Sequence, residues 1–574
     1  MGSGFNASGD SGKKKKILIA GATSLILVAM VVGVTVGIRG NGNGGSGSKS
    51  PASSQVSTTS KSIQAICQPT DYRETCESSL NKAAGNVTDP QKLVQAGFEV
   101  AVNALQDALN KSATLNELAK DPMAHQALEI CQELVDTAID DLKKSFSSLG
   151  AFDLTNFDSY VENLKVWLSA TITYQQTCLD GFENTTGNAG QKMKEFLTLS
   201  SQLTSNGLAM VDGLASILKD LNIPDLIGQR RLLENGHDMP AWITAARKNL
   251  LLATPATVKP TVVVAKDGSG NFATVTEALN SLPKKKNSTI VIYIKEGIYK
   301  EQIKIPRSLS NVFMIGDGPT KSRITGSLNF ADGVQTFKTS TVTISGENFM
   351  AKDMGFENSA GAIGHQAVAL RVQSDRSIFY NCHMDGYQDT LYAHTYRQFY
   401  RDCVISGTID FIFGDAAVVF QNCKLVVRKP LENQRCIVTA NGRNYSKEVT
   451  GFVIQNCTIT ADPAYYPVRF ENPAYLARPW KEYSKTIFMQ SQIDDLIDPK
   501  GWLAWMGSWG LDTCYYAEYK NRGAGSNTSK RETWKGIKTI TPQEAQTYTP
   551  GQFIQGDQWI PNTGVPYTAG MITV

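Results

Sequence analysis

The pattern of apolar and polar positions divides this chain into a helical and a β-rich part. Between residues 61 and 220, apolar residues recur every three or four positions, as in the stretch from Leu128 to Phe146. Similar stripes lie in three further stretches, 90–109, 157–180 and 193–218. This period is typical of amphipathic helices, and four such helices predict an all-α four-helix bundle over 61–220. From about residue 255, short β-rich runs replace the stripes: 261–265, 289–294, 312–315 and 341–344.

A four-residue element ending in Asn-Cys or Asp-Cys recurs within the β-rich part. The four copies are Phe379-Tyr380-Asn381-Cys382, Tyr400-Arg401-Asp402-Cys403, Phe420-Gln421-Asn422-Cys423 and Ile454-Gln455-Asn456-Cys457. Successive cysteines are 21, 20 and 34 residues apart. A repeat of about 20 residues in a β-rich chain is typical of a solenoid. We therefore predict an all-β right-handed parallel β-helix over 255–574, with a long loop in the coil of 34 residues.

The same period brings four polar side chains together. Gln366 and Gln388 are 22 residues apart, and Asp389 and Asp410 are 21 apart. Residues one coil apart stack at about 4.8 Å, so these four residues are expected on three successive coils. A solvated polar ladder would give the same spacing. However, Asp410 lies among apolar residues in the segment 409–413, where an aspartate needs a specific role.

Two neighbouring carboxylates suggest acid–base chemistry. They cannot both ionise cheaply, so the pKa of one is raised while the other stays ionised, and such a pair supplies an acid and a nucleophile. Glycoside hydrolysis also uses two carboxylates. The glutamines favour acyl chemistry instead, because side-chain amides stabilise an oxyanion. The chain has no Gly-x-Ser-x-Gly nucleophile elbow, and its five histidines offer little for zinc or histidine-based catalysis.

The N-terminal region predicts entry into the secretory pathway. Residues 17–38 carry no charge and are long enough to span a bilayer. Lys13–Lys16 precede them and would keep residues 1–16 in the cytoplasm, so a signal-anchor is favoured over a cleaved signal peptide. Ten cysteines suit an oxidising compartment. Glycan acceptor sequences occur at Asn86, Asn110, Asn184, Asn287, Asn444, Asn456 and Asn527.

Two segments have the composition of linkers. Residues 39–60 are rich in Gly, Ser and Thr. Residues 221–254 contain Arg230-Arg231-Leu232-Leu233, a dibasic site that a protease could reach. The net charge of +3 includes the four N-terminal lysines, and together with the lack of a suitable fold signature it argues against nucleic-acid binding.

Five motifs in the β-rich part make the chain resemble plant pectin methylesterases. They are Gly297-Ile298-Tyr299-Lys300-Glu301, Gln366-Ala367-Val368-Ala369-Leu370, Gln388-Asp389-Thr390-Leu391, Asp410-Phe411-Ile412-Phe413-Gly414 and Leu476-Ala477-Arg478-Pro479-Trp480. The resemblance implies a parallel β-helix that hydrolyses the methyl esters of homogalacturonan without a metal or another cofactor. A monomer is expected.

The resemblance also implies a role for each site residue. Asp410 is the expected nucleophile and Asp389 the general acid and base. Gln366 and Gln388 would form the oxyanion hole, and Arg478 would orient Asp410. Thr336, Gln366, Arg478 and Trp480 are expected to bind substrate. The fifth motif departs from the family pattern, since Ala477 replaces a glycine; if positive φ is needed there, Arg478 would be displaced.

The helical part resembles pectin methylesterase inhibitors through four cysteines. The resemblance implies the disulfides Cys67–Cys76 and Cys131–Cys178, and in the β-helix the disulfide Cys403–Cys423. Spacing alone would equally pair Cys382 with Cys403, and it leaves Cys436, Cys457 and Cys514 unassigned. Arg230–Leu233 resembles a processing site, so a subtilisin-like protease and separate inhibitor proteins are expected partners. The bundle is expected to silence the enzyme or assist its folding.

Two alternative functions remain open at the level of sequence. A polygalacturonase or pectate lyase would share the β-helix, although a lyase needs an acidic calcium site and a basic residue that the motifs lack. A non-catalytic protein could combine an inhibitor with a wall-binding β-helix. Trp502, Trp505 and Trp509 form a second aromatic cluster, for which core packing is the commoner role and a sugar cleft the alternative.

Overall fold

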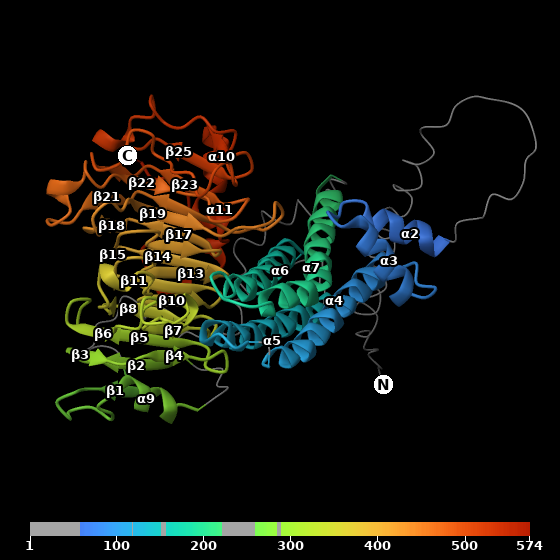
Figure 1. The fold of residues 1–574 in the computed structure, drawn as a ribbon, viewed down its shortest axis with the longest axis horizontal. Coiled ribbons are helices and arrows are strands. Elements are labelled where there is room, and N and C mark those ends of the chain that lie inside the picture. Colours follow the sequence, from blue (N-terminus) through green and yellow to red (C-terminus); the bar gives the residue numbers. More distant parts are fainter. Residues whose placement is uncertain (1–57, 118, 151–156, 221–258, 284–288, 574) are drawn as a thin grey trace, which may run out of the picture.

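The structure is a computed structural model that describes residues 58–117, 119–150, 157–220, 259–283 and 289–573. It contains a helical part and a stack of parallel strands, which lie side by side (Figure 1). The predicted membrane segment 17–38 and the predicted processing site 230–233 lie outside the described residues. Within the described residues, no helix is both long and apolar enough to cross a membrane.

The helical part is the predicted four-helix bundle. Its long helices are α4 (Pro90–Ser112), α5 (Pro122–Gly150), α6 (Phe157–Asp180) and α7 (Ala189–Asp220). The short helices α2 (Thr58–Cys67) and α3 (Arg73–Ala83) precede them, and η1 (Ala113–Leu115) follows α4. Each long helix packs on two others. Apolar residues of the predicted stripes, such as Leu105, Leu128 and Leu168, are fully buried between them, which confirms the sequence prediction.

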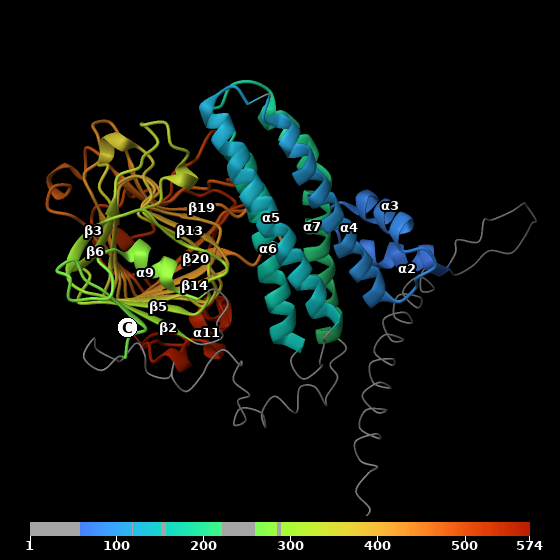
Figure 2. The same cartoon turned by 90° about the horizontal axis from the view of Figure 1, so that it is seen from below.

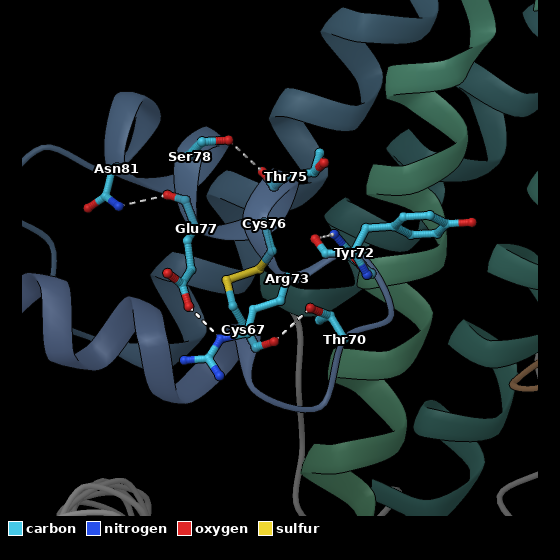
Figure 3. Close-up of a disulfide and its surroundings, with 10 residues drawn as sticks. Cys67, Thr70, Tyr72, Arg73, Thr75, Cys76, Glu77, Ser78 and Asn81 are labelled. Carbon is cyan, nitrogen blue, oxygen red and sulfur yellow. Dashed lines mark hydrogen bonds and ion pairs between the residues drawn. A yellow bond between two sulfur atoms is a disulfide. The ribbon is translucent and has the colours of Figure 1, made fainter.

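Both disulfides predicted for the helical part are present. Cys67–Cys76 joins α2 to α3 with a Cα–Cα distance of 5.7 Å, and Figure 3 shows it beside Thr70 and Tyr72. Cys131–Cys178 joins α5 to α6 with a Cα–Cα distance of 4.5 Å. The second bond closes a loop of 47 residues, so it restricts the unfolded chain strongly.

The β-rich part is the predicted parallel β-helix, built from three parallel sheets. The eleven-stranded sheet contains β1 (Val262–Val264), β2 (Ile290–Ile294), β5 (Val312–Gly316), β8 (Met350–Lys352), β11 (Ser377–Tyr380), β14 (Arg397–Arg401), β17 (Ala417–Gln421), β20 (Gly451–Gln455), β23 (Lys485–Met489), β25 (Tyr515–Tyr519) and β26 (Ile537–Lys538). The eight-stranded sheet contains β3 (Gly297–Lys300), β6 (Ser322–Gly326), β9 (Gly355–Asn358), β12 (His383–Asp385), β15 (Val404–Gly407), β18 (Lys424–Val427), β21 (Thr458–Ala461) and β24 (Gln492–Ile493). The seven-stranded sheet contains β4 (Ile303–Ile305), β7 (Val342–Ile344), β10 (Leu370–Gln373), β13 (Leu391–Thr395), β16 (Ile412–Gly414), β19 (Cys436–Asn441) and β22 (Ala474–Ala477). From β2 to β24, each coil visits the eleven-, eight- and seven-stranded sheets in turn.

The repeated Asn-Cys or Asp-Cys element marks the corner between the eleven- and eight-stranded sheets in four coils. Its Asn or Asp has a left-handed backbone, with φ of 50° at Asn381, 52° at Asp402 and 57° at Asn422. Asn and Asp tolerate this conformation better than other non-glycine residues. The aromatic residues of the element stack inside the β-helix, where the ring centroid of Tyr400 lies 4.8 Å from those of both Phe379 and Phe420.

The structure contradicts the predicted Cys403–Cys423 disulfide, because both residues are free and buried. In a parallel ladder, equivalent side chains point the same way, so their Cβ atoms stay near the strand spacing of about 4.8 Å, beyond the roughly 3.8 Å that a disulfide prefers. The thiols instead donate to carbonyl groups of the preceding coil, Cys403 to Phe379 and Cys423 to Tyr400. Cys382, Cys436, Cys457 and Cys514 are also free and buried.

Short helices cover other surfaces of the β-helix. The helix α9 (Val275–Ser281) packs at its N-terminal end, where Val275 and Ala278 join the interior core. The helices α10 (Pro542–Thr547) and α11 (Pro550–Phe553) lie with Trp559 against the outer face of the eleven-stranded sheet. The seven-stranded sheet instead faces the bundle, and α5 and α6 lie directly against it (Figure 2).

Four glycan acceptors among the described residues are exposed, and two are not. Asn86, Asn110, Asn184 and Asn527 are exposed. Asn444 is half-buried and donates its side-chain amide to Gln176 of α6. Asn456 is half-buried and donates to Asn422. A glycan on Asn444 is therefore incompatible with the docked bundle.

Candidate active site

The strand register places the two aspartates one coil apart. Leu391 of β13 pairs with Ile412 of β16, and each lies two residues after its aspartate. The backbone N–H of Asp389 donates to Ile409, the residue before Asp410, at 3.0 Å. Gln366 pairs with Gln388 across the preceding coil. The predicted arrangement of Gln366, Gln388, Asp389 and Asp410 on three successive coils is therefore present.

Both aspartates occupy the corner between the eight- and seven-stranded sheets. Their φ angles are 62° at Asp389 and 49° at Asp410, which is the left-handed region. Aspartate accepts this conformation more readily than most residues, so the corner can hold a carboxylate on consecutive coils. Asp389 and Asp410 are buried, with 8 % and 4 % of each residue's surface exposed.

Arg478 forms a two-pronged ion pair with Asp410. Its Nε donates to Oδ1 at 2.8 Å, and its Nη2 makes a short contact with Oδ2. The indole of Trp505 lies against the other side of the guanidinium, 4.2 Å from its carbon. Bidentate pairing is the strongest form of arginine–carboxylate contact, so Asp410 is held as an oriented carboxylate.

Ala477 does not displace Arg478. It lies in strand β22, is fully buried, and has no positive φ. The next residue reaches Asp410 directly. The position that carries glycine in the family pattern therefore needs no positive φ in this chain, and Arg478 is not displaced from Asp410.

Asp389 is the carboxyl group of the pair whose pKa is raised. Burial raises its pKa well above 3.8, and the negative charge of Asp410 raises it further. Arg478 acts in the opposite direction, but it does not cancel these effects. The site therefore places a carboxyl group with a raised pKa one coil from a carboxylate that an arginine binds, an arrangement that suits an acid beside a nucleophile.

The two glutamine amides are available to a ligand. Gln366 and Gln388 are half-buried, and no hydrogen bond within the described part of the chain engages either side-chain amide. Their backbones are held firmly, since Gln366 accepts from Phe330 and Gln388 accepts from Ala367. Free N–H donors on a fixed backbone suit the stabilisation of an oxyanion.

An aromatic surface continues from the carboxylates. Tyr392 and Phe413 each follow an aspartate by three residues, and their rings stack at 4.2 Å. Trp480 meets Phe413 edge to face at 6.0 Å. Sequence reasoning identified Trp480 but missed Tyr392 and Phe413, although the coil period that located the aspartates would also have paired these two rings.

The remaining predicted residues take separate positions. Thr336 begins the short helix η6 (Thr336–Lys338), and no hydrogen bond in the described part of the chain connects it with either carboxylate. Trp502 is buried in the core and stacks on Tyr516. Trp509 is half exposed and donates to the carbonyl of Trp480. Sequence reasoning did not identify the contact of Trp505 with Arg478.

The described residues hold no cluster of three or more His, Cys, Asp or Glu side chains suited to a metal ion. The polar groups at the site are instead two carboxyls, a guanidinium and two amides. Together these can bind an ester carbonyl and deliver a proton to its leaving group.

Comparisons with known proteins identify similar chains. The family model Pectinesterase matches residues 261–557, and the model Plant invertase/pectin methylesterase inhibitor matches residues 61–210. Pectinesterase/pectinesterase inhibitor 28 of Arabidopsis thaliana is 51% identical over 98% of this chain and 76% of its own length. Pectinesterase 3 of Phaseolus vulgaris is 42% identical over 90% of this chain and 89% of its own. The solved structure of pectin methylesterase from carrot is 50% identical, covers 55% of this chain and 99% of its own, and gives a TM-score of 0.54.

The raised pKa of Asp389 predicts that Asp389→Asn stabilises the protein above acidic pH. Ionising a buried carboxyl with a raised pKa costs folding stability, and this loss grows as pH rises through the folded-state value. Below the ordinary pKa of 3.8, the variant and the wild type should unfold alike. At pH 8 the variant should gain on the order of 1 kcal/mol, measured by denaturant unfolding.

The control for this experiment is Asp512→Asn, which changes an exposed aspartate in the same domain. It should leave the pH dependence of unfolding unchanged. Equal stability of Asp389→Asn and wild type at pH 8 would show that Asp389 ionises there without cost.

Proposed function

The chain belongs to the pectinesterase family, and from this premise we propose that Asp410 is the nucleophile and Asp389 the general acid and base of its reaction. Pectinesterases hydrolyse the methyl esters of pectin. The observation that carries the proposal is the ion pair of Arg478 with Asp410, one coil from a buried, protonated Asp389. This arrangement supplies both carboxyl groups in the protonation states that the first step needs.

The first half of the reaction forms an acyl-enzyme. A carboxylate oxygen of Asp410 attacks the ester carbonyl carbon of a methylated galacturonate. The resulting oxyanion accepts hydrogen bonds from the amides of Gln366 and Gln388. When the tetrahedral intermediate collapses, its bond to the methoxy oxygen breaks and Asp389 gives that oxygen its proton. Methanol leaves, and an anhydride joins the substrate to Asp410.

The second half releases the acid product. Asp389, now ionised, takes a proton from a water molecule as the water oxygen attacks the substrate carbonyl. Collapse of the second tetrahedral intermediate breaks the bond to Asp410 and frees the galacturonate. Asp410 returns to its carboxylate form beside Arg478, and Asp389 is protonated for the next cycle.

Asp410→Asn tests the nucleophile. The amide cannot form the acyl-enzyme, so methanol release from methylated pectin should fall by about 10⁴-fold or more. The assay should use a chain freed from its bundle, because the docked bundle would mask the difference. Asp512→Asn is the matched control and should keep full activity. A chain that keeps its activity after Asp410→Asn would require another nucleophile.

We also propose that the bundle silences the enzyme in cis, because it packs on the face that holds the site. Tyr392 and Phe413 share one apolar cluster with residues of α5 and α6. Lys481, next to Trp480, forms a largely buried ion pair with Asp180 of α6 at 2.6 Å. A polymer that must pass along this surface cannot reach Asp410 while the bundle stays docked.

Polar contacts support the same docking. The side-chain amide of Gln335 donates to the carbonyl groups of Met123 and Gly181. Asp141 of α5 is fully buried and accepts from Arg307 at 2.6 Å and from Tyr396. Buried hydrogen bonds of this kind are lost when the parts separate, so they add specificity to the apolar contact.

Asp180→Lys tests the silencing role. The new lysine would face Lys481 in a largely buried position, where like charges are costly. Methanol release by the full chain should rise by about 10-fold or more. The control is Glu195→Lys, which reverses an exposed residue of α7 that pairs with Lys192 in its own helix. Equal activity of wild type, Asp180→Lys and the bundle-free chain would show that the bundle does not inhibit.

We further propose that the chain enters the secretory pathway through residues 17–38 and is cut at Arg230–Leu233 on its way to the cell wall. The uncharged segment, the preceding lysines, the acceptor asparagines and the resemblance of Arg-Arg-Leu-Leu to a processing site support this route. A subtilisin-like protease and separate inhibitor proteins would be its partners. The mass of the secreted product should correspond to a start within or directly after residues 230–233, and Arg230→Ala with Arg231→Ala should leave the bundle attached.

A further inference from the structure

We propose that the face of the β-helix beneath the bundle is a binding track for the carboxylates of de-esterified galacturonan, and that acidic side chains of the bundle occupy this track in their place. This inference rests on the proposed function, because it assumes that the released β-helix acts on galacturonan. It adds a second ligand chemistry. The reaction needs a methyl ester at Asp410, whereas the track would hold sugars that have already lost theirs.

Ion pairs across the contact run almost entirely in one direction. Cations of the β-helix meet acids of the bundle in the pairs Lys304–Glu133, Arg307–Asp141, Lys338–Glu129, Lys447–Asp212, Lys481–Asp180 and Lys481–Glu183. Among the described residues, one pair runs the other way, Lys144–Glu347. The bundle thus presents a polyanion to a cationic surface.

Three of these acids lie on one side of a single helix. Glu129, Glu133 and Asp141 of α5 are separated by four and eight residues, so they follow one face over about 18 Å. Their partners come from two neighbouring segments, strand β4 with the residues that follow it (Lys304 and Arg307) and the short helix η6 (Lys338). A stretch of unesterified galacturonate would also present a row of carboxylates, as this face of α5 does.

The cationic row leads to the catalytic centre. Lys304 of β4 is in register with Thr343 of β7, then with Arg371 of β10, Tyr392 of β13 and Phe413 of β16. Three coils separate Lys304 from Tyr392, a distance of about 14 Å. A polymer lying along this row would place its unesterified part over Lys304 and Arg371 and its next sugar at the aspartates.

Arg371 provides the most specific feature of the track. It is 4 % exposed, and the ring of Phe337 lies 3.3 Å from its guanidinium carbon. Its terminal nitrogens reach only neutral oxygens, of Gln373 and Thr343, and its Nε has no hydrogen-bond partner among the described residues. No carboxylate in the described part of the chain lies within ion-pair distance of it. A guanidinium held in this way lacks the anionic partner that it binds best.

The test uses the complete chain with a protease site inserted in segment 221–254, so that the bundle can leave after cutting. Unesterified oligogalacturonate should release the bundle, detected by size-exclusion chromatography. Fully methyl-esterified oligomer of the same length should not release it at the same concentration. Equal release by both oligomers would overturn the carboxylate assignment. Equal release by dextran sulfate of matched length would overturn the assignment to galacturonan.

A charge swap distinguishes binding of the oligomer to the track from docking of the bundle. Lys304→Glu should weaken the binding of both the bundle and the oligomer, because the new carboxylate repels the acidic groups of each. Lys304→Glu with Glu133→Lys restores the ion pair, so the bundle should dock as in wild type. The oligomer concentration that releases the bundle should nevertheless rise by about 5-fold or more. The control is Lys321→Glu, a change at an exposed residue directly before strand β6, and it should behave as wild type.

If the chain with Lys304→Glu and Glu133→Lys released its bundle at the same oligomer concentration as wild type, the proposed binding track would be refuted. Methanol release from fully esterified pectin by the same cut chain is measured in parallel. Its absence would refute the proposed esterase roles, while the difference between the oligomers would still report on the track. The two failures are therefore distinguishable.

Discussion

Every coil of the β-helix turns through a residue with positive φ, and the geometry of the candidate active site depends on this turn. Residues that accept positive φ are scarce, and aspartate and asparagine are the common choices outside glycine. At the corner between the eleven- and eight-stranded sheets, these residues precede the buried cysteines. At the corner between the eight- and seven-stranded sheets, the same requirement is met by Asp389 and Asp410. The backbone need that shapes the solenoid thus also places two carboxyl groups one strand spacing apart.

Placing two acids so close creates an electrostatic conflict, and the surroundings resolve it unequally. Arg478 binds one carboxylate through two hydrogen bonds, and the other carboxyl keeps its proton because burial raises its pKa. The free amides of Gln366 and Gln388 add donors without partners beside them. Such groups cost stability in a resting protein and contribute to transition-state binding. The site therefore combines strain, burial and unsatisfied donors in a few residues, and the regular core beneath it carries the stability.

While it is docked, the bundle offsets part of the stability that the candidate site costs the β-helix. Its apolar side chains cover Tyr392 and Phe413, and its acids neutralise the cations along the seven-stranded sheet. Under the proposals made for this face, one surface serves two ligands in succession, a folded polyanionic domain before processing and a polysaccharide afterwards. Arg371 is the exception, because within the described residues the bundle places no carboxylate within ion-pair distance of its guanidinium.

The amino-acid sequence by itself determined the period of the fold and, through it, much of the site. The spacing of Cys382, Cys403 and Cys423 predicts the coil length, and the spacing of Asp389 and Asp410 then places the carboxyls, because a parallel ladder converts sequence distance directly into spatial distance. The ion pair of Arg478 was expected only from the resemblance, since it spans 68 residues and a long loop. The tertiary structure decided what depends on the direction of side chains and on contacts between distant segments. It showed that Cys403 and Cys423 are free, that Trp505 lies against Arg478, and that α5 and α6 lie over the face that holds the candidate site. Periodicity cannot reveal these facts, because it fixes which residues share a coil, and not which separate surfaces meet.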